Sequence, residues 1–129
     1  MSAHPEFTLS FNLTATNEQR QEMASLYEKA FHAKKLCESM PPDGQDLHIM
    51  MELCGMEILL GPGGAVGSGL QNPIICEVRF ADSQEFYRAY EVLKQEGKEA
   101  SMEGPYPWAY RLALVTDKFG IGWALYLNP

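Results

Sequence analysis

The segment Gly61–Pro73 (GPGGAVGSGLQNP) divides the chain of 129 residues into two halves that carry the same order of structural signals. It holds five glycines and two prolines in thirteen residues, a composition that disfavours both helix and strand. We therefore expect a linker over residues 61–73 that lies outside any sheet. It would separate a first module at residues 7–60 from a second module at residues 74–128.

The half before the linker opens with Phe7–Leu13 (FTLSFNL), in which apolar and polar residues alternate as in a half-buried strand. A helix capped by Thr14 or Thr16 should follow, because apolar residues then recur at helical spacing. Three strands would complete this module. They are expected at Lys34–Met40, Leu47–Cys54 and Glu57–Gly61, the last two forming a hairpin around Gly55.

The half after the linker repeats this order, beginning with an alternating strand at Ile74–Ala81 (IICEVRFA). Asp82 or Ser83 can cap a helix that stops near Gly97. Three further strands are expected at Lys98–Glu103, Tyr110–Thr116 and Gly122–Asn128. The sequence therefore predicts an α+β fold of two βαβββ modules, which would pack together because neither half could cover its own apolar face.

Composition restricts the class of protein. Lys and Arg number 10 against 17 Asp and Glu, for a net charge of −7, which argues against nucleic acid or an anionic membrane as a partner. No apolar run reaches the ~20 residues of a membrane-spanning helix. Three scattered cysteines are too few for a disulfide framework, so we expect a cytoplasmic protein with these cysteines buried in strands.

Two motifs carry a family resemblance. The run Leu26–Ala33 (LYEKAFHA) is similar to F-Y-x-x-x-F-G-A, and Trp108 followed by Val115–Trp123 (VTDKFGIGW) is similar to W-G … V-x-D-P-F-G-x-x-W. On these residues the sequence resembles the vicinal-oxygen-chelate superfamily of glyoxalase, bleomycin-resistance and dioxygenase proteins, and within it the PhnB-like, glyoxalase-related branch. It departs at His32, where that pattern has Gly, and at Lys118, where it has Pro.

The resemblance implies a cup-shaped, mostly antiparallel half-barrel that holds a ligand or a metal, and a homodimer. Metal-dependent members place a His, Gln or Glu on the first and last strand of each module. Leu, Ile and Ala cannot coordinate a metal, so we expect no standard metal site and no cofactor. The matching positions here carry Thr8 or Ser10, Leu59, Ile75 and Ala124.

Several residues are candidates to line such a cup. His48, Met50 and Glu52 alternate along one strand and so share a face, although His48 could equally be a partly exposed sheet histidine. Glu77 and Arg79 are the polar candidates of the next module. The complete candidate set for ligand binding is His48, Met50, Glu52, Glu77, Arg79, Trp108, Arg111 and Tyr126.

Two of these candidates have competing interpretations. Arg111 alternates onto the same strand face as Ala113 and Val115. If that face is inward, the guanidinium needs an anionic ligand or a carboxylate partner such as Glu77 or Glu52. Otherwise Arg111 forms an internal ion pair or lies at a sheet edge. Trp108, in a proline-bounded loop, is either a packing anchor or a wall that stacks over a planar ligand.

Three functions remain open at this stage. The leading one is a glyoxalase-fold homodimer that binds a small hydrophobic or aromatic molecule without the standard metal site. The second is a divalent-metal lyase, isomerase or dioxygenase with an atypical ligand set drawn from His48, Glu52 and Glu77. The third is a non-catalytic interaction domain whose cup is closed by Met50, Met51 and Trp108. No catalytic residue is assigned.

Overall fold

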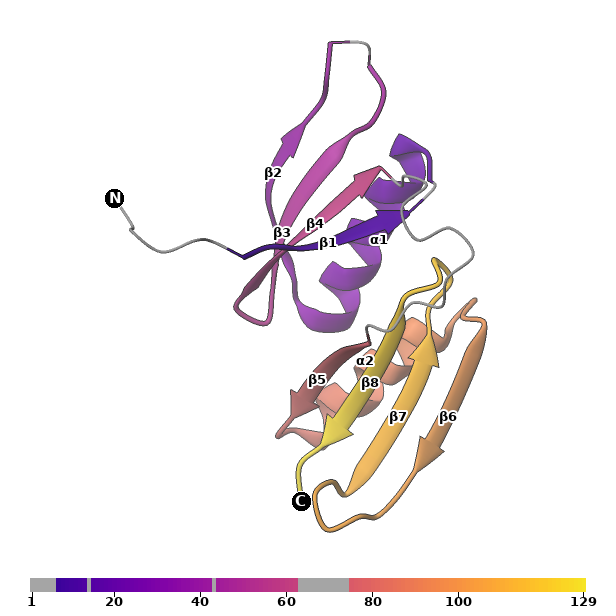
Figure 1. Ribbon diagram of the computed structural model, residues 1–129. Coiled ribbons are helices and arrows are strands. Elements are labelled where there is room, and N and C mark those ends of the chain that lie inside the picture. Colours follow the sequence, from indigo (N-terminus) through magenta and orange to yellow (C-terminus); the bar gives the residue numbers. More distant parts are fainter. Residues whose placement is uncertain (1–6, 14, 43, 63–74) are drawn as a thin grey trace, which may run out of the picture. The chain divides into compact units, whose positions relative to one another are not determined.

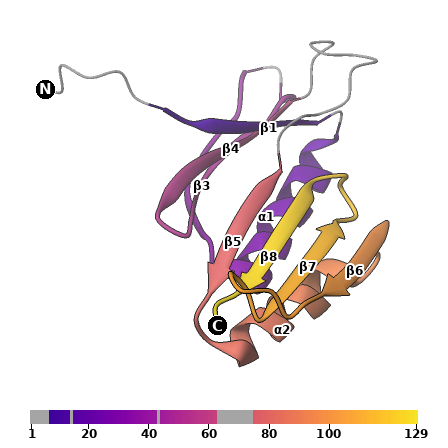
Figure 2. The ribbon, with the colours of Figure 1, turned by 60° about the horizontal axis from the view of Figure 1, so that its bottom comes forward.

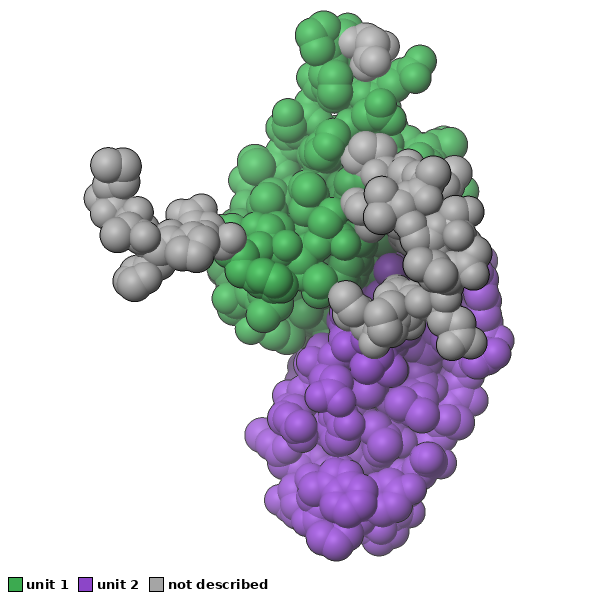
Figure 3. Space-filling view, in the orientation of Figure 1, with its two compact units in different colours: residues 1–65 green, residues 66–129 purple. Residues whose placement is uncertain are grey.

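The computed structural model describes residues 7–13, 15–42, 44–62 and 75–129 (Figure 1). The chain divides into two compact units, Met1–Ala65 and Val66–Pro129, which are coloured separately in Figure 3. Each unit has one helix and one four-stranded sheet in the order βαβββ. The elements are β1 (Leu9–Leu13), α1 (Asn17–Phe31), β2 (Lys34–Ser39), β3 (His48–Leu53), β4 (Met56–Pro62), β5 (Cys76–Phe80), α2 (Ser83–Lys94), β6 (Glu99–Glu103), β7 (Arg111–Thr116) and β8 (Gly122–Leu127).

In the first unit the strands lie in the order β1-β4-β3-β2, with β1 parallel to β4 and the other pairs antiparallel. Thr16 caps α1 through a capping box with Gln19, which decides between the two expected caps. The helix packs against β3 and β4. Its apolar stripe and the facing strand residues are buried; they are Met23, Ala24, Tyr27, Ala30 and Phe31 on α1 and Ile49, Met51, Ile58 and Leu60 on the sheet.

The second unit repeats this arrangement with the strand order β5-β8-β7-β6 (Figure 2). Strand β5 runs parallel to β8, and the remaining pairs are antiparallel. The Asp82 side chain caps α2 by accepting a hydrogen bond from the Gln84 backbone N–H at 2.9 Å. Phe86, Ala89, Tyr90 and Leu93 of α2 are buried, and the helix packs on β5, β7 and β8. The predicted α+β fold with two βαβββ modules is therefore confirmed.

Two boundaries, the end of β4 and the end of α2, differ from the sequence-based expectation. Strand β4 continues through Gly61 and Pro62, which pair with Asn12 and Leu13 of β1, so these two residues of the expected linker belong to a sheet. Parallel pairing with β1 extends strand β4 beyond Leu60, the last residue of its apolar run. The other expected linker residues, 63–73, lie outside the described ranges. Helix α2 ends at Lys94 rather than near Gly97.

Gly97 has a different role from a helix cap. A Cβ at this position would lie 2.9 Å from the backbone oxygen of Thr116, so the glycine permits a close approach between the end of α2 and β7. The left-handed backbone conformation falls instead on Glu96, with a φ of 57°. The first unit likewise places a residue other than glycine in this conformation, because His32 caps α1 with a φ of 56°.

The expectation of buried cysteines was wrong for two of the three. Cys37 and Cys54 are exposed, and Cys76 is half-buried. Cys37 lies on the edge strand β2, all of whose residues are exposed. Cys54 lies in the tight turn between β3 and β4 with a φ of 52°, where no neighbouring strand covers it.

Candidate functional site

Each sheet has one face covered by its helix and one opposite face, which we call the distal face. In the second unit Ala113, Val115, Trp123 and Leu125 are buried on the side of α2. Adjacent residues of a strand point to opposite faces, and paired residues of neighbouring strands point to the same face. The register therefore places on the distal face Glu77, Arg79, Glu99, Ser101, Glu103, Leu112, Leu114, Thr116, Gly122, Ala124 and Tyr126.

Glu77, Arg79 and Tyr126 form a polar cluster on this distal face. The Tyr126 hydroxyl donates a hydrogen bond to Glu77 Oε2 at 2.9 Å, and an Arg79 guanidinium nitrogen lies 4.0 Å from Glu77 Oε1. The guanidinium carbon of Arg79 also lies 4.5 Å from the centre of the Tyr126 ring. The hydrogen bond to the Glu77 carboxylate raises the pKa of the Tyr126 phenol above its usual range. Three of the expected site residues are thus brought together.

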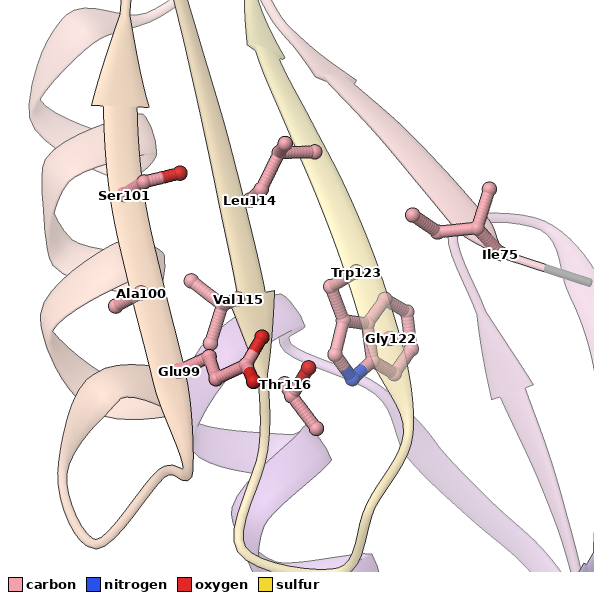
Figure 4. Close-up of a pocket in the computed structure, with 9 residues that line it drawn as sticks. All are labelled: Ile75, Glu99, Ala100, Ser101, Leu114, Val115, Thr116, Gly122 and Trp123. Atoms are coloured by element: carbon pink, nitrogen blue, oxygen red, sulfur yellow. The ribbon is translucent and has the colours of Figure 1, made fainter. Parts of the chain in front are cut away.

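A pocket of about 320 Å³ lies on the same sheet, toward the other end of β5 and β8 (Figure 4). Ile75 and Leu114 supply exposed apolar side chains, at 50% and 37% exposure. Glu99, Ser101 and Thr116 supply polar groups, and Gly122 leaves room between them because it has no side chain. Backbone or side-chain atoms of Ala100, Val115 and Trp123 complete the lining.

Arg111 does not join this site. It pairs with Leu127, whereas Tyr126 pairs with Leu112, so Arg111 lies on the α2 side of the sheet and Tyr126 on the distal face. Its guanidinium donates to the Tyr110 carbonyl at 2.9 Å and lies 4.7 Å from the centre of the Tyr110 ring. The possible partnership between Arg111 and Glu77 is therefore excluded within this unit, because the two residues occupy opposite faces.

Trp108 is not a packing anchor, since 59% of its surface is exposed. Its ring stacks on Tyr106 with centroids 4.9 Å apart and planes 2° from parallel. Both residues lie in the loop between β6 and β7, where Tyr106 and Ala109 form an isolated bridge. The loop thus presents an aromatic surface, and the alternative role of Trp108 as a stacking wall stays a prediction.

The first sheet carries its own distal face, and the three expected residues of β3 lie on it. Ile49, Met51 and Leu53 are buried on the side of α1, so the alternating His48, Met50 and Glu52 point the other way. Met50 pairs with Leu59 and Glu52 pairs with Glu57. His48 Nδ1 lies 2.7 Å from the Asp46 carbonyl oxygen, which engages one ring nitrogen locally.

Donors for a metal are sparse at the centres of the distal faces. Ser10 pairs with Leu59 in the first sheet, and Glu77 pairs with Ala124 in the second. The expected position Ile75 lies just before β5, and the residue in register with Ala124 is Glu77. The pair of Glu77 and Ala124 therefore offers one carboxylate. Within residues 7–13, 15–42, 44–62 and 75–129, no group of three or more His, Cys, Asp or Glu side chains could hold a metal ion.

A second pocket, of about 370 Å³, lies at the start of α1. Its lining includes the buried Arg20, which donates to the Ala15 carbonyl at 2.9 Å and to Asn17 Oδ1 at 2.6 Å. Asn17 in turn accepts from the Leu47 backbone N–H at 2.9 Å and donates to the Gly44 carbonyl at 3.1 Å. These bonds connect the helix start to the segment before β3, which is a structural role.

Sequence reasoning missed Glu99, Ser101, Leu114 and Thr116 as pocket residues. The signal was present as alternation, because Glu99, Ser101 and Glu103 share a face of β6. It also left unexplained the motif residue Asp117, which is fully buried. The Asp117 carboxylate accepts hydrogen bonds from the backbone N–H groups of Phe119 and Ile121 and from Trp123 Nε1, at 2.9, 3.0 and 2.9 Å. This carboxylate fixes the loop between β7 and β8, whose flanking residues Thr116 and Gly122 line the pocket.

No family model and no curated protein matches the chain. Solved structures do match. A PhnB protein from Bacillus cereus shares 20% identity over 94% of this chain and 96% of its own, with a TM-score of 0.71. The fosfomycin resistance protein FosX from Listeria monocytogenes shares 15% identity over 100% and 96%, with a TM-score of 0.69. The same FosX has been solved in complex with Mn(II) and sulfate.

A third similar structure is a glyoxylase/bleomycin resistance protein/dioxygenase domain from Frankia sp. EAN1pec. It shares 14% identity over 100% of this chain and 99% of its own, with a TM-score of 0.62. No helix among the described residues is long and apolar enough to cross a membrane. The similarity to these three structures spans both modules, and the chain has the vicinal-oxygen-chelate fold.

Proposed function

We propose that this protein binds a small hydrophobic or aromatic molecule on the distal face of its second sheet, as a homodimer and without the four-donor metal site. The observation that carries this proposal is the pocket of about 320 Å³ in which Ile75, Leu114 and Gly122 form an apolar surface. The polar cluster of Glu77, Arg79 and Tyr126 lies on the same face and would orient a ligand. A mostly apolar pocket with a few placed polar groups is typical of small-molecule sites.

Donor chemistry supports the metal-independent form of this function. Of the paired positions at the sheet centres, Leu59 and Ala124 have no ligating atom, and Ser10 is a poor primary ligand for zinc, nickel or iron. Glu77 is the one carboxylate among these four, and its Oε2 already accepts the Tyr126 hydrogen bond. A metal held by one carboxylate would exchange readily.

A divalent-metal enzyme is the second candidate, because a FosX of the same fold has been solved with Mn(II). The atypical set for it would be His48, Glu52 and Glu77. His48 and Glu52 are four residues apart on β3, or about 13 Å along the strand, so one ion could not bind both without further ligands. The interaction-domain alternative loses one element, since Met51 is fully buried under α1 and cannot close a cup together with Met50.

A thermal-shift screen of a library of small aromatic and aliphatic molecules tests the proposal, run with and without Ni²⁺, Zn²⁺, Mn²⁺ and Fe²⁺. A ligand that binds only the folded protein raises its melting temperature, and we expect hits that do not depend on added metal. Hits that require one of the metals would favour the enzyme. Light scattering should report twice the monomer mass, whereas a stable monomer at micromolar concentration would contradict the dimer.

A further inference from the structure

The pocket of the second sheet has an acidic residue at its edge. Glu99 lies on the edge strand β6, in register with Thr116 of β7, and both residues line the pocket. Figure 4 shows the Glu99 carboxylate beside the Thr116 side chain, at the end of the pocket that also holds Gly122. Ile75, which lies beside Gly122, and Leu114 supply the apolar side chains of the pocket. The pocket therefore has a carboxylate at its β6 edge and apolar side chains on β7 and just before β5.

No ion pair among the described residues involves Glu99. The cation on the same distal face, Arg79, lies in the cross-strand row of Tyr126, two residues further along β5 than the row of Glu77 and Ala124. Its guanidinium already contacts Glu77 and the Tyr126 ring. The Glu99 charge is thus not offset within the pocket, and the net charge of −7 adds a field of the same sign.

We propose that this pocket binds an apolar molecule that carries a protonated amine, with the amine beside Glu99 and the apolar body on Ile75, Leu114 and Gly122. This inference rests on the proposed small-molecule function and specifies its ligand class. An ammonium group can donate to both the Glu99 carboxylate and the Thr116 hydroxyl. A carboxylate-bearing ligand of the same shape would meet the uncompensated Glu99 charge and bind more weakly.

Three naphthyl compounds of similar size and different charge provide the test: 2-(2-naphthyl)ethylamine, 2-(2-naphthyl)ethanol and 2-naphthylacetate. Their binding to the full chain is measured by calorimetric titration, and backbone amide NMR shifts on β6, β7 and β8 locate the site. We expect the amine to bind most tightly and the acetate most weakly. Because an exposed ion pair changes an equilibrium constant by about twofold to fivefold, the amine should exceed the alcohol by about that factor, and less so at high salt.

Glu99→Gln should remove the advantage of the amine over the alcohol, because the amide carries no charge for the ammonium group to pair with. Glu103→Gln is the matched control, because Glu103 lies on the same strand and face but about 13 Å from Glu99 and outside the pocket lining. It should preserve the advantage. Equal binding of amine and alcohol to the unmodified protein would overturn the amine assignment while the proposed function stands. Absence of binding by all three compounds would overturn the assignment and count against the proposed function as well.

Discussion

The two modules share strand order but close their last hairpins differently. In the first module Cys54 and Gly55 form a two-residue turn between the paired Leu53 and Met56, with φ of 52° and 82°. Positive φ at both positions is the pattern of a type I′ turn, which needs no side-chain support. In the second module a longer loop is held by the buried Asp117 carboxylate and its three hydrogen bonds.

The pocket of the second module lies next to this longer loop. The Asp117 loop begins after Thr116 and ends before Gly122, and both of these residues line the pocket. The tight turn of the first module holds no comparable side chain. The same βαβββ module can therefore close its last hairpin with either a tight turn or a longer loop. The loop held by a buried carboxylate is the one next to the candidate site.

The largest effect should come from Asp117→Ala. The change leaves two backbone N–H groups and the Trp123 indole N–H without their acceptor in a buried place, so we expect the free energy of unfolding to fall by about 3 kcal/mol. Cys54→Ala, at the corresponding corner of the first module, should change it by less than about 0.5 kcal/mol. Urea denaturation of both variants measures this. Equal losses would show that the two corners are energetically alike.

Gly122→Val should separate binding from stability. A Cβ at Gly122 would lie 3.7 Å from Ile75, an ordinary contact, so the sheet can accept the side chain while the pocket is filled. Affinity for ligands found in the screen should fall about tenfold, or about 1.4 kcal/mol, with little change in melting temperature. Gly97→Ala is the contrasting variant, since its Cβ would lie 2.9 Å from the Thr116 oxygen and destabilise the fold. Unchanged affinity in Gly122→Val would place the ligand elsewhere.

His32→Gly and Glu96→Gly test a feature that the modules share. Both residues follow a helix in the left-handed conformation, with φ of 56° and 57°. A left-handed residue other than glycine costs about 1–2 kcal/mol, part of which returns as the larger backbone entropy of glycine in the unfolded chain. Each variant should therefore be more stable by about 0.5–1 kcal/mol in urea denaturation. Alanine at either position should bring no gain.

The smallest expected effect is the titration of Tyr126. Its pKa is raised by the hydrogen bond to Glu77, so the bonded phenol contributes stability that is fully present below the ordinary tyrosine pKa. That contribution is lost as the pH rises through the higher pKa of the folded state. Ultraviolet titration of tyrosinate should show one phenol that ionises late and disappears in Tyr126→Phe. In Glu77→Gln the pKa of the Tyr126 phenol should move back toward the usual range. A pKa that stays raised in this variant would contradict Glu77 as the cause.

The sequence was informative about elements because alternation and caps are local signals. Phe7–Leu13 and Ile74–Ala81 predicted strands, and Thr16 and Asp82 were among the expected caps. The errors arose from tertiary contacts. The expected strand Glu57–Gly61 ended one residue early, because Pro62, which was assigned to the linker, pairs with Leu13 of β1. Gly97 was expected to stop a helix, yet a glycine is required there by the close approach of the Thr116 backbone oxygen.

For the candidate site, the sequence could predict only which residues share one face of a strand. Alternation correctly grouped His48 with Glu52 and Glu77 with Arg79. It also grouped Arg111 with Ala113 and Val115, but it could not say that α2 covers that face. Glu99 was not predicted as a pocket residue, because the pocket also needs Gly122 and Ile75, which are distant in sequence. The strand order β5-β8-β7-β6 places all three around one pocket.

Metal content tests the central claim, that this fold serves ligand binding here without a four-donor metal centre. The protein is purified without chelator and its nickel, zinc, manganese and iron are measured by plasma mass spectrometry against protein concentration. We predict a total well below one metal ion per chain, and ligand binding that is unchanged by EDTA. One tightly bound ion per chain, lost on chelation together with ligand binding, would contradict the account and favour the metal-dependent enzyme.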